Sequence, residues 1–154
     1  MNIRIKKLHP NAKAPIYGTE DAGCFDLHAA TVDGYSETGS VIHADHPVVC
    51  GTGLAFEIPK GRLMLIFSRS GHGFKDNVRL ANCVGAIDAD YRGEVKVKLT
   101  CDIDTPDDAP PLRIDPGSRV AQALIIPAER VTFTFSDELS ETERGAGGFG
   151  STGK

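Results

Sequence analysis

The chain has 154 residues and a formal net charge of −4 at pH 7. This length suits one domain with a real core, and the negative charge excludes a general attraction to nucleic acid. No apolar run approaches the roughly 20 residues that cross a bilayer, so we expect neither a nucleic-acid nor a membrane partner.

The first half of the chain predicts strands and one short helix. Apolar and basic side chains alternate over residues 3–6, a pattern typical of a half-buried strand. The continuous apolar run 63–67 predicts a strand that is buried on both sides. Only the stretch 70–75 leaves room for a helix.

The second half predicts three more strands and a tail. Residues 93–102 alternate between apolar and polar side chains, as do residues 131–135, and both patterns predict half-buried strands. The apolar run 121–126 predicts another strand buried on both sides. Periodicity disappears from Ser136 onward, so we expect a domain over residues 1–136 and a flexible, glycine-rich tail over residues 137–154.

Proline and glycine recur at short intervals between these segments. Many short strands with regular turn signals predict an all-β fold, whether sandwich, jelly roll or barrel.

Two features suggest a metal or disulfide site, but each has a simpler interpretation. His43, Asp45 and His46 have no further ligand at useful spacing, so we expect a solvated loop. The four cysteines contain no CxxC pair, and we expect reduced thiols. The N-terminus has no apolar block typical of a signal peptide. The expected location is therefore the cytoplasm, or the host cytoplasm if the source is viral.

The turn after the apolar run 63–67 has the composition of a phosphate cradle. Ser68, Arg69, Ser70 and Gly71 precede the expected helix. Free backbone N–H groups at a helix start and a guanidinium fork both suit phosphate oxygens. A strand-to-helix turn of this kind is common, however, and by itself predicts little.

The segment Asn82–Gly93 (NCVGAIDADYRG) is more specific, because it combines two acids, an aromatic and glycines. Asp88 follows an apolar strand, where a fixed and partly desolvated carboxylate suits a general base. The alternative is a hairpin in which Asp88 or Asp90 is only a turn residue. Further along, Arg119 and Gln122 flank a buried strand, and a buried Gln needs partners, which the backbone alone could supply.

Together these segments resemble the trimeric dUTPase family over nearly the whole chain. Five motifs occur in order: AGCFDLHA (22–29), RSG (69–71), NCVGAIDADYRG (82–93), GSRVAQ (117–122) and RGAGGFGSTG (144–153). The resemblance implies a jelly-roll-like β-barrel with one short helix. It also implies hydrolysis of dUTP to dUMP and pyrophosphate, which limits uracil incorporation into DNA and supplies dUMP for dTTP synthesis.

The family's catalytic groups can be placed on this sequence. Water would attack the α-phosphorus, and Asp88 occupies the position of the base that activates it. Gln122 would join the phosphate network. Asp26 resembles an aspartate that reaches Mg²⁺ through water, and the ion would gather the triphosphate.

The resemblance also implies the substrate contacts. Asn82 would read the uracil edge, Tyr91 would pack against the deoxyribose, Arg144 would grip the γ-phosphate and Phe149 would stack on uracil. The full set that would bind substrate is Arg69, Ser70, Gly71, Asn82, Gly85, Ile87, Tyr91, Lys96, Arg144, Phe149, Gly150, Ser151 and Thr152.

The sequence departs from the family pattern at one point, and the family pattern also implies a homotrimer. Two residues, Cys24 and Phe25, separate Gly23 from Asp26 where one is usual, which puts the role of Gly23 in doubt and, slightly, that of Asp26. Family members form homotrimers with shared active sites. A detached tail that carries Arg144 and Phe149 is in keeping with such sharing, and we expect it to order only with nucleotide.

Two rival functions stay open at the level of sequence. A dCTP deaminase, or a bifunctional deaminase and dUTPase, shares the Arg-Ser turn and the jelly roll, but it uses a glutamate in the later hairpin. A non-catalytic trimeric β module that binds a partner protein is the second rival, since fold does not fix function. The full set of motifs favours dUTPase over both.

Overall fold

In a computed structural model, which describes residues 1–102 and 112–148, the chain consists of short strands and one short helix. The predicted predominance of strands is confirmed, and so is the helix, α1 (Ser70–Asp76). The strands before α1 are β1 (Arg4–Lys7), β2 (Ile16–Tyr17), β3 (Phe25–His28), β4 (Thr31–Val32), β5 (Ser40–Val41), β6 (Val48–Gly51), β7 (Leu54–Glu57) and β8 (Arg62–Phe67). Those after it are β9 (Val78–Leu80), β10 (Val84–Ile87), β11 (Lys96–Cys101), β12 (Arg113–Ile114) and β13 (Arg119–Pro127).

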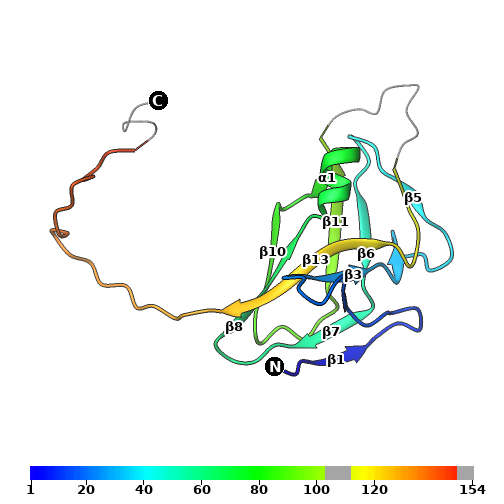
Figure 1. Cartoon of the computed structure of the whole chain (residues 1–154), viewed down its shortest axis with the longest axis horizontal. Coiled ribbons are helices and arrows are strands. Elements are labelled where there is room, and N and C mark those ends of the chain that lie inside the picture. Colours follow the sequence, from blue (N-terminus) through cyan, green and yellow to red (C-terminus); the bar gives the residue numbers. More distant parts are fainter. Residues whose placement is uncertain (103–111, 149–154) are drawn as a thin grey trace.

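Two larger sheets form the body of the protein (Figure 1). One has the strand order β10-β8-β13-β3-β2, and the other has the order β4-β6-β11-β9. Two small pairs, β1-β7 and β12-β5, complete the described strands, which form no single closed barrel. One hydrophobic core joins both larger sheets, with Leu27 and Ile66 from the first packed in the same cluster as Val48 and Val97 from the second.

Strand β11 forms where alternation predicted it. Val97, Leu99 and Cys101 are buried, whereas Lys96 and Lys98 are exposed. Successive side chains of a strand point to opposite faces, so this pattern fixes one face on the core. The long connection before β12 includes residues 103–111, which lie outside the described part.

The two continuous apolar runs form β8 and the greater part of β13, but the prediction that both faces are buried was wrong for this chain. In β8, Met64 and Ile66 are buried while Leu63, Leu65 and Phe67 are only half-buried. The second face of this sheet is therefore apolar but incompletely covered by the chain itself. An apolar run predicts that its side chains are buried, but it does not show whether the same chain or another molecule covers them.

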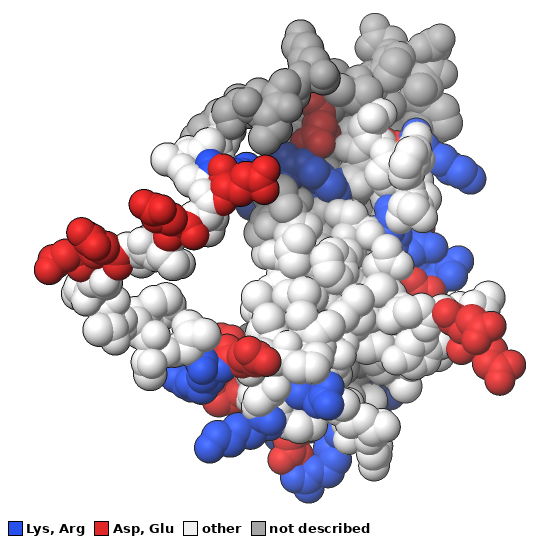
Figure 2. Space-filling model, turned by 60° about the vertical axis from the view of Figure 1, so that its left-hand side comes forward, with Lys and Arg blue, Asp and Glu red and all other residues white. Residues whose placement is uncertain are grey.

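The alternating segment 131–135 forms no strand. After Pro127 the chain leaves the body as an extended segment (Figure 1), on which acidic side chains are spaced (Figure 2). Val131, Phe133 and Phe135 are 66%, 92% and 106% exposed. A strand needs a neighbour for its backbone hydrogen bonds, and none of the described residues supplies one. We call residues 131–135 the apolar arm.

No helix in the described part of the chain is long and apolar enough to span a membrane.

Candidate active site

A half-buried cluster of charges is assembled from three distant segments. Asp26 on β3 lies opposite Gln122 on β13, and Gln122 lies opposite Phe67 on β8, which Arg69 closely follows. The Asp26 carboxylate contacts Arg69 Nε at 3.5 Å and Arg119 Nη1 at 3.1 Å, and its side chain is only 14% exposed. We call Asp26, Arg69 and Arg119 the phosphate-side cluster.

A β-bulge on β13 helps to place one member of this cluster. Arg119 lies opposite His28, but Ala121 already lies opposite Leu27, so Val120 is the extra residue. Bulges bend a strand and re-aim its side chains. Here the Arg119 guanidinium reaches Asp26 on the neighbouring strand, and the Arg119 carbonyl accepts a hydrogen bond from Arg69 Nη1 at 3.2 Å.

Gln122 serves the backbone beside the cluster. Its side-chain nitrogen donates to the Ser68 carbonyl at 2.9 Å, which fixes the turn that leads into α1. Ser70 and Gly71 follow in the first turn of α1, Ser70 exposed and Gly71 half-buried. The structure thus brings Gln122 next to the turn that carries Ser70 and Gly71, and one hydrogen bond of Gln122 positions that turn.

Two histidines that sequence reasoning did not single out border the cluster. His72 in α1 lies 3.4 Å from Arg69 Nη1, and His28 pairs with Arg119 across the sheet. Burial lowers the pKa of His72, and the positive charge of Arg69 lowers it further. Burial also lowers the pKa of His28, with the Lys13 charge as the next cause. Both rings therefore favour the neutral form at neutral pH. The available signal was their position, since His28 lies inside the motif 22–29 and His72 directly follows the motif 69–71.

The unusual spacing before Asp26 is absorbed outside the strand. Phe25 is buried and begins β3, so Gly23 and Cys24 form a bend that precedes it. A Cβ at Gly23 would meet nothing within 4 Å. The extra residue therefore leaves Asp26 in register with Gln122.

The second group of predicted residues lies in the segment between β10 and β11. Asp88 directly follows β10, and the Tyr91 N–H donates to the Asp88 carbonyl at 3.2 Å, closing a turn. The Tyr91 hydroxyl donates to the Glu94 carbonyl at 3.0 Å. A Cβ at Gly93 would lie 2.4 Å from that hydroxyl oxygen, so only glycine lets the tyrosine ring lie there.

A cavity of about 450 Å³ opens beside this turn. Its lining includes four of the predicted residues, namely Ile87, Asp88, Tyr91 and Lys96. Asp88 is exposed in the chain, so its predicted partial desolvation is not supplied by the chain itself. Asn82 and Gly85 lie at the far end of β10, and Cys83 between Asn82 and the strand has a left-handed φ of 63°.

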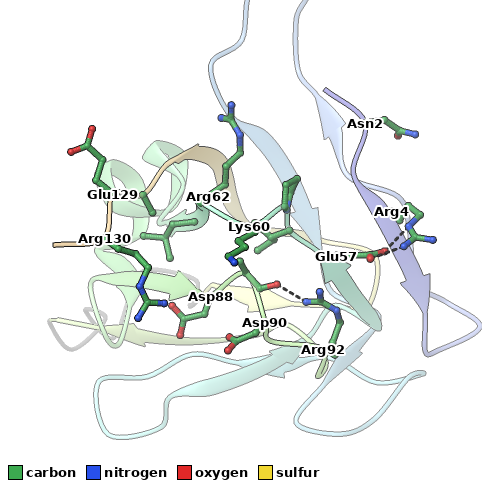
Figure 3. A pocket seen from close by; sticks show the side chains of 16 residues that line it. Asn2, Arg4, Glu57, Lys60, Arg62, Asp88, Asp90, Arg92, Glu129 and Arg130 are labelled. Carbon is green, nitrogen blue, oxygen red and sulfur yellow. Dashed lines mark hydrogen bonds and ion pairs between the residues drawn. The ribbon is translucent and has the colours of Figure 1, made fainter. Parts of the chain in front are cut away.

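Glu94 is a further lining residue that the sequence did not reveal. Its carboxylate accepts the Gly53 N–H at 2.9 Å and pairs with Lys96 Nζ at 3.3 Å. Glu94 therefore holds the lysine against the cavity while its own carbonyl holds Tyr91. A larger cavity, of about 820 Å³, lies across the turn and is lined by Asp88, Asp90 and Arg92, among other residues (Figure 3).

The two groups of residues do not meet within one chain. Strand β10 pairs with β8 so that Ile87 lies opposite Met64, five residues before Arg69. At about 3.4 Å per residue this separates the start of the Asp88 turn from Arg69 by roughly 17 Å along the sheet. The predicted base and the phosphate-side cluster thus lie toward opposite ends of β8.

The tail residues lie apart from both groups. Arg144 Nε donates to the Gly147 carbonyl at 2.8 Å, at the end of the segment that leaves the body (Figure 1). Phe149, Gly150, Ser151 and Thr152 lie outside the described residues.

The resemblance leads us to expect a Mg²⁺ ion near Asp26. Within residues 1–102 and 112–148, no group of three His, Cys, Asp or Glu side chains could hold a metal ion. His43, Asp45 and His46 accordingly form no such group. Asp26 offers the single carboxylate of the phosphate-side cluster. Mg²⁺ is usually bound by one or two carboxylates, waters and substrate phosphates. The residues present fit that mode of binding.

Comparisons with known proteins find relatives along nearly the whole chain. A family model described as dUTPase matches residues 11–153. A deoxyuridine 5′-triphosphate nucleotidohydrolase of Nautilia profundicola is 44% identical over 154 residues, covering 100% of both chains. One of Picosynechococcus is 41% identical over 154 residues, covering 99% of each.

Solved structures are similar along the same length. The dUTPase of Staphylococcus bacteriophage 80alpha, as a mutant with dUpNHpp, has a TM-score of 0.84 and 26% identity, covering 99% of both chains. A mutant dUTPase from phage phi11 of S. aureus, in which the coordination of a structural Mg(II) ion is described, has a TM-score of 0.76 at 20% identity, covering 92% of this chain and 100% of that one. These likenesses confirm the predicted jelly-roll-like fold.

Proposed function

The chain belongs to the dUTPase family and hydrolyses dUTP to dUMP and pyrophosphate, and from that premise we propose how its residues divide the work. Asp88 activates the water that attacks the α-phosphorus, and the phosphate-side cluster holds the triphosphate. The observation that carries this proposal is the cavity that Asp88, Tyr91 and Lys96 share. A carboxylate beside a cavity can act as a general base once substrate is bound.

The hairpin side of the site reads the nucleoside. The Tyr91 ring, held by the Glu94 carbonyl and lying over Gly93, packs against the deoxyribose and leaves no room for a 2′-hydroxyl. Asn82 and the backbone near Gly85 read the uracil edge. Lys96, held by Glu94, contributes a positive charge close to the reacting phosphate.

The phosphate side neutralises and aligns the anion. Without substrate, the positive charges of Arg69 and Arg119 face the Asp26 carboxylate. A triphosphate competes for these guanidinium groups, and Ser70 and Gly71 add donors from the first turn of α1. Asp26 would help to hold a Mg²⁺ ion, which would supply charge neutralisation of the phosphate oxygens. Positioning and electrostatics of this kind carry phosphoanhydride hydrolysis.

We further propose that active sites form between copies in a homotrimer. The separation of roughly 17 Å between the Asp88 turn and Arg69 leaves each group incomplete in one chain. The apolar arm supplies a means of assembly, since burying a Phe contributes about 1.5–3 kcal/mol and Phe133 and Phe135 are almost fully exposed. The arm of one copy docks on a neighbour and carries residues 137–154 to that neighbour's site.

The tail closes the assembled site. Arg144 grips the γ-phosphate, Phe149 stacks on uracil, and Gly150, Ser151 and Thr152 wrap the phosphates. The protein works in the cytoplasm, in keeping with the free thiols of Cys24, Cys50 and Cys83.

A nucleotide panel tests this proposal. Purified protein is incubated with Mg²⁺ and dUTP, dTTP, dCTP or UTP while pyrophosphate and ammonia are measured. We expect pyrophosphate from dUTP alone, and ammonia from dCTP would instead support the deaminase. Asp88→Asn lowers kcat by about 10²–10⁴-fold, the usual share of a general base. Asp90→Asn, a neighbouring acid in the same turn, is the matched control. Wild-type turnover by Asp88→Asn would remove Asp88 from the role of base.

A further inference from the structure

The turn that carries Asp88 is held by a guanidinium group from the residue just beyond it. Arg92 Nη1 donates to the Ala89 carbonyl at 2.7 Å and to the Tyr91 carbonyl at 2.9 Å. These bonds span the turn that the Tyr91 N–H and the Asp88 carbonyl close. Figure 3 shows the Arg92 side chain next to Asp90 at the edge of the larger cavity, which Asp88 also lines.

The charged groups around Arg92 do not account for its position. Glu57 is nearby, but the Glu57 carboxylate is bonded to Arg4 at 2.6 Å, and that hydrogen bond is the main reason why its pKa is lowered. Asp90 lines the same cavity without a salt bridge to Arg92 among the described residues. The hydrogen bonds of Arg92 to its own turn are therefore the contacts that fix its side chain.

An arginine is suited to this task in a way that a lysine is not. Its planar fork presents donors in fixed directions, so the two carbonyls are held with less loss of side-chain freedom than a lysine on its flexible stem would incur. Without it, the 88–91 turn keeps one internal hydrogen bond, at 3.2 Å, and the pairing of β10 with β8. Both Asp88 and Tyr91 lie at the ends of that turn, so a looser turn displaces the base relative to the sugar.

We propose that Arg92 is a positioning residue for the hydrolysis, which fixes the turn so that the Asp88 carboxylate meets the attacking water. This inference rests on the proposed role of Asp88. Arg92 need not touch the substrate, and its effect is on the chemical step rather than on binding. A misplacement of about 1 Å in a catalytic group can cost roughly 10²-fold in rate.

The test compares Arg92→Ala, Arg92→Lys and the control Arg62→Ala. Arg62 lines the same cavity, and its side chain makes no hydrogen bond to the turn among the described residues. We expect Arg92→Ala to lower kcat by about 10–100-fold while KM for dUTP changes less than about threefold. Arg92→Lys should be intermediate, and Arg62→Ala should behave like wild type. Millimolar guanidinium chloride should restore part of the kcat of Arg92→Ala, because it can donate to the same two carbonyls, whereas a loss caused by global destabilisation would not be relieved.

Thermal melting and the oligomeric state are measured for each variant in parallel. If Arg92→Ala misfolds, the kcat of Arg92→Lys decides, since it keeps the charge and most of the volume. Wild-type kcat in folded Arg92→Lys and Arg92→Ala would overturn the inference. So would a loss of kcat in Arg62→Ala equal to that in Arg92→Ala, or a loss of kcat in Arg92→Ala that guanidinium does not relieve. Asp88→Asn is assayed beside them. An inactive Asp88→Asn with a normal Arg92→Ala refutes only the role of Arg92, whereas an active Asp88→Asn refutes the role of the base.

Discussion

The phosphate-side cluster and the Asp88 turn differ in how they are built. The cluster joins residues from three segments, up to 93 positions apart, and its carboxylate is only 14% exposed. The turn is local, is held by hydrogen bonds within five residues, and leaves Asp88 exposed. The contacts of the half-buried side thus form within one chain, whereas the exposed side awaits a cover. A site divided in this way is expected when a neighbouring copy supplies that cover.

The largest expected effect comes from removing the proposed means of assembly, the apolar arm. Replacing Phe133 and Phe135 with serine removes about 3–6 kcal/mol of apolar burial per chain, which weakens association by roughly 10²–10⁴-fold. Sedimentation should show dissociation, and activity should fall with it. Unchanged trimers in this double variant would break the link between the apolar arm and the shared site.

A smaller effect is expected from removing only the closing segment. Truncation before Arg144 should lower kcat/KM by about 10²-fold, since charge stabilisation and exclusion of water are lost. The melting temperature and the trimer should be unchanged, which calorimetry and sedimentation can check. A truncated chain that unfolds would instead make the tail a structural element.

The smallest effect concerns the histidines at the cluster. The folded-state pKa of His72 is lowered from the usual 6.5, chiefly by burial. The unfolded chain therefore binds more protons below that pH, and the free energy of unfolding falls as pH drops through about 6.5. Melting temperatures between pH 7.5 and 5.5 test this, and His72→Gln should show a flatter profile. A wild-type profile with no decline would contradict the assignment of a neutral His72.

Local patterns predicted the local features of the protein. Alternation identified β11, and the Ser-Arg-Ser-Gly turn before a helix was found where α1 begins. The motif residues of the cluster were identified by resemblance, and their pairing followed only from the register of β3 with β13. Glu94 and Arg92 escaped sequence reasoning because their roles depend on hydrogen bonds to backbone atoms, which no residue pattern displays.

The apolar arm shows that a residue pattern can also predict an element that the chain by itself does not form. Residues 131–135 have the alternation of a strand, yet they form none in the chain by itself. The pattern encodes burial and pairing without stating the partner. The same reason applies to the half-buried face of β8, whose apolar side chains are only partly covered by the chain itself.

The central claim is that base and phosphate-side cluster act from different copies, and mixed assembly tests it most directly. Asp88→Asn and Arg69→Ala are each inactive alone, and they are unfolded together, refolded at equal amounts and assayed. If each site takes its base from one copy and its cluster from the next, about a quarter of wild-type activity returns in random trimers. A matched mixture of Arg69→Ala with Gln122→Ala, both on the cluster side, stays inactive. No recovery in mixed trimers verified by mass spectrometry would show that the two groups act within one chain.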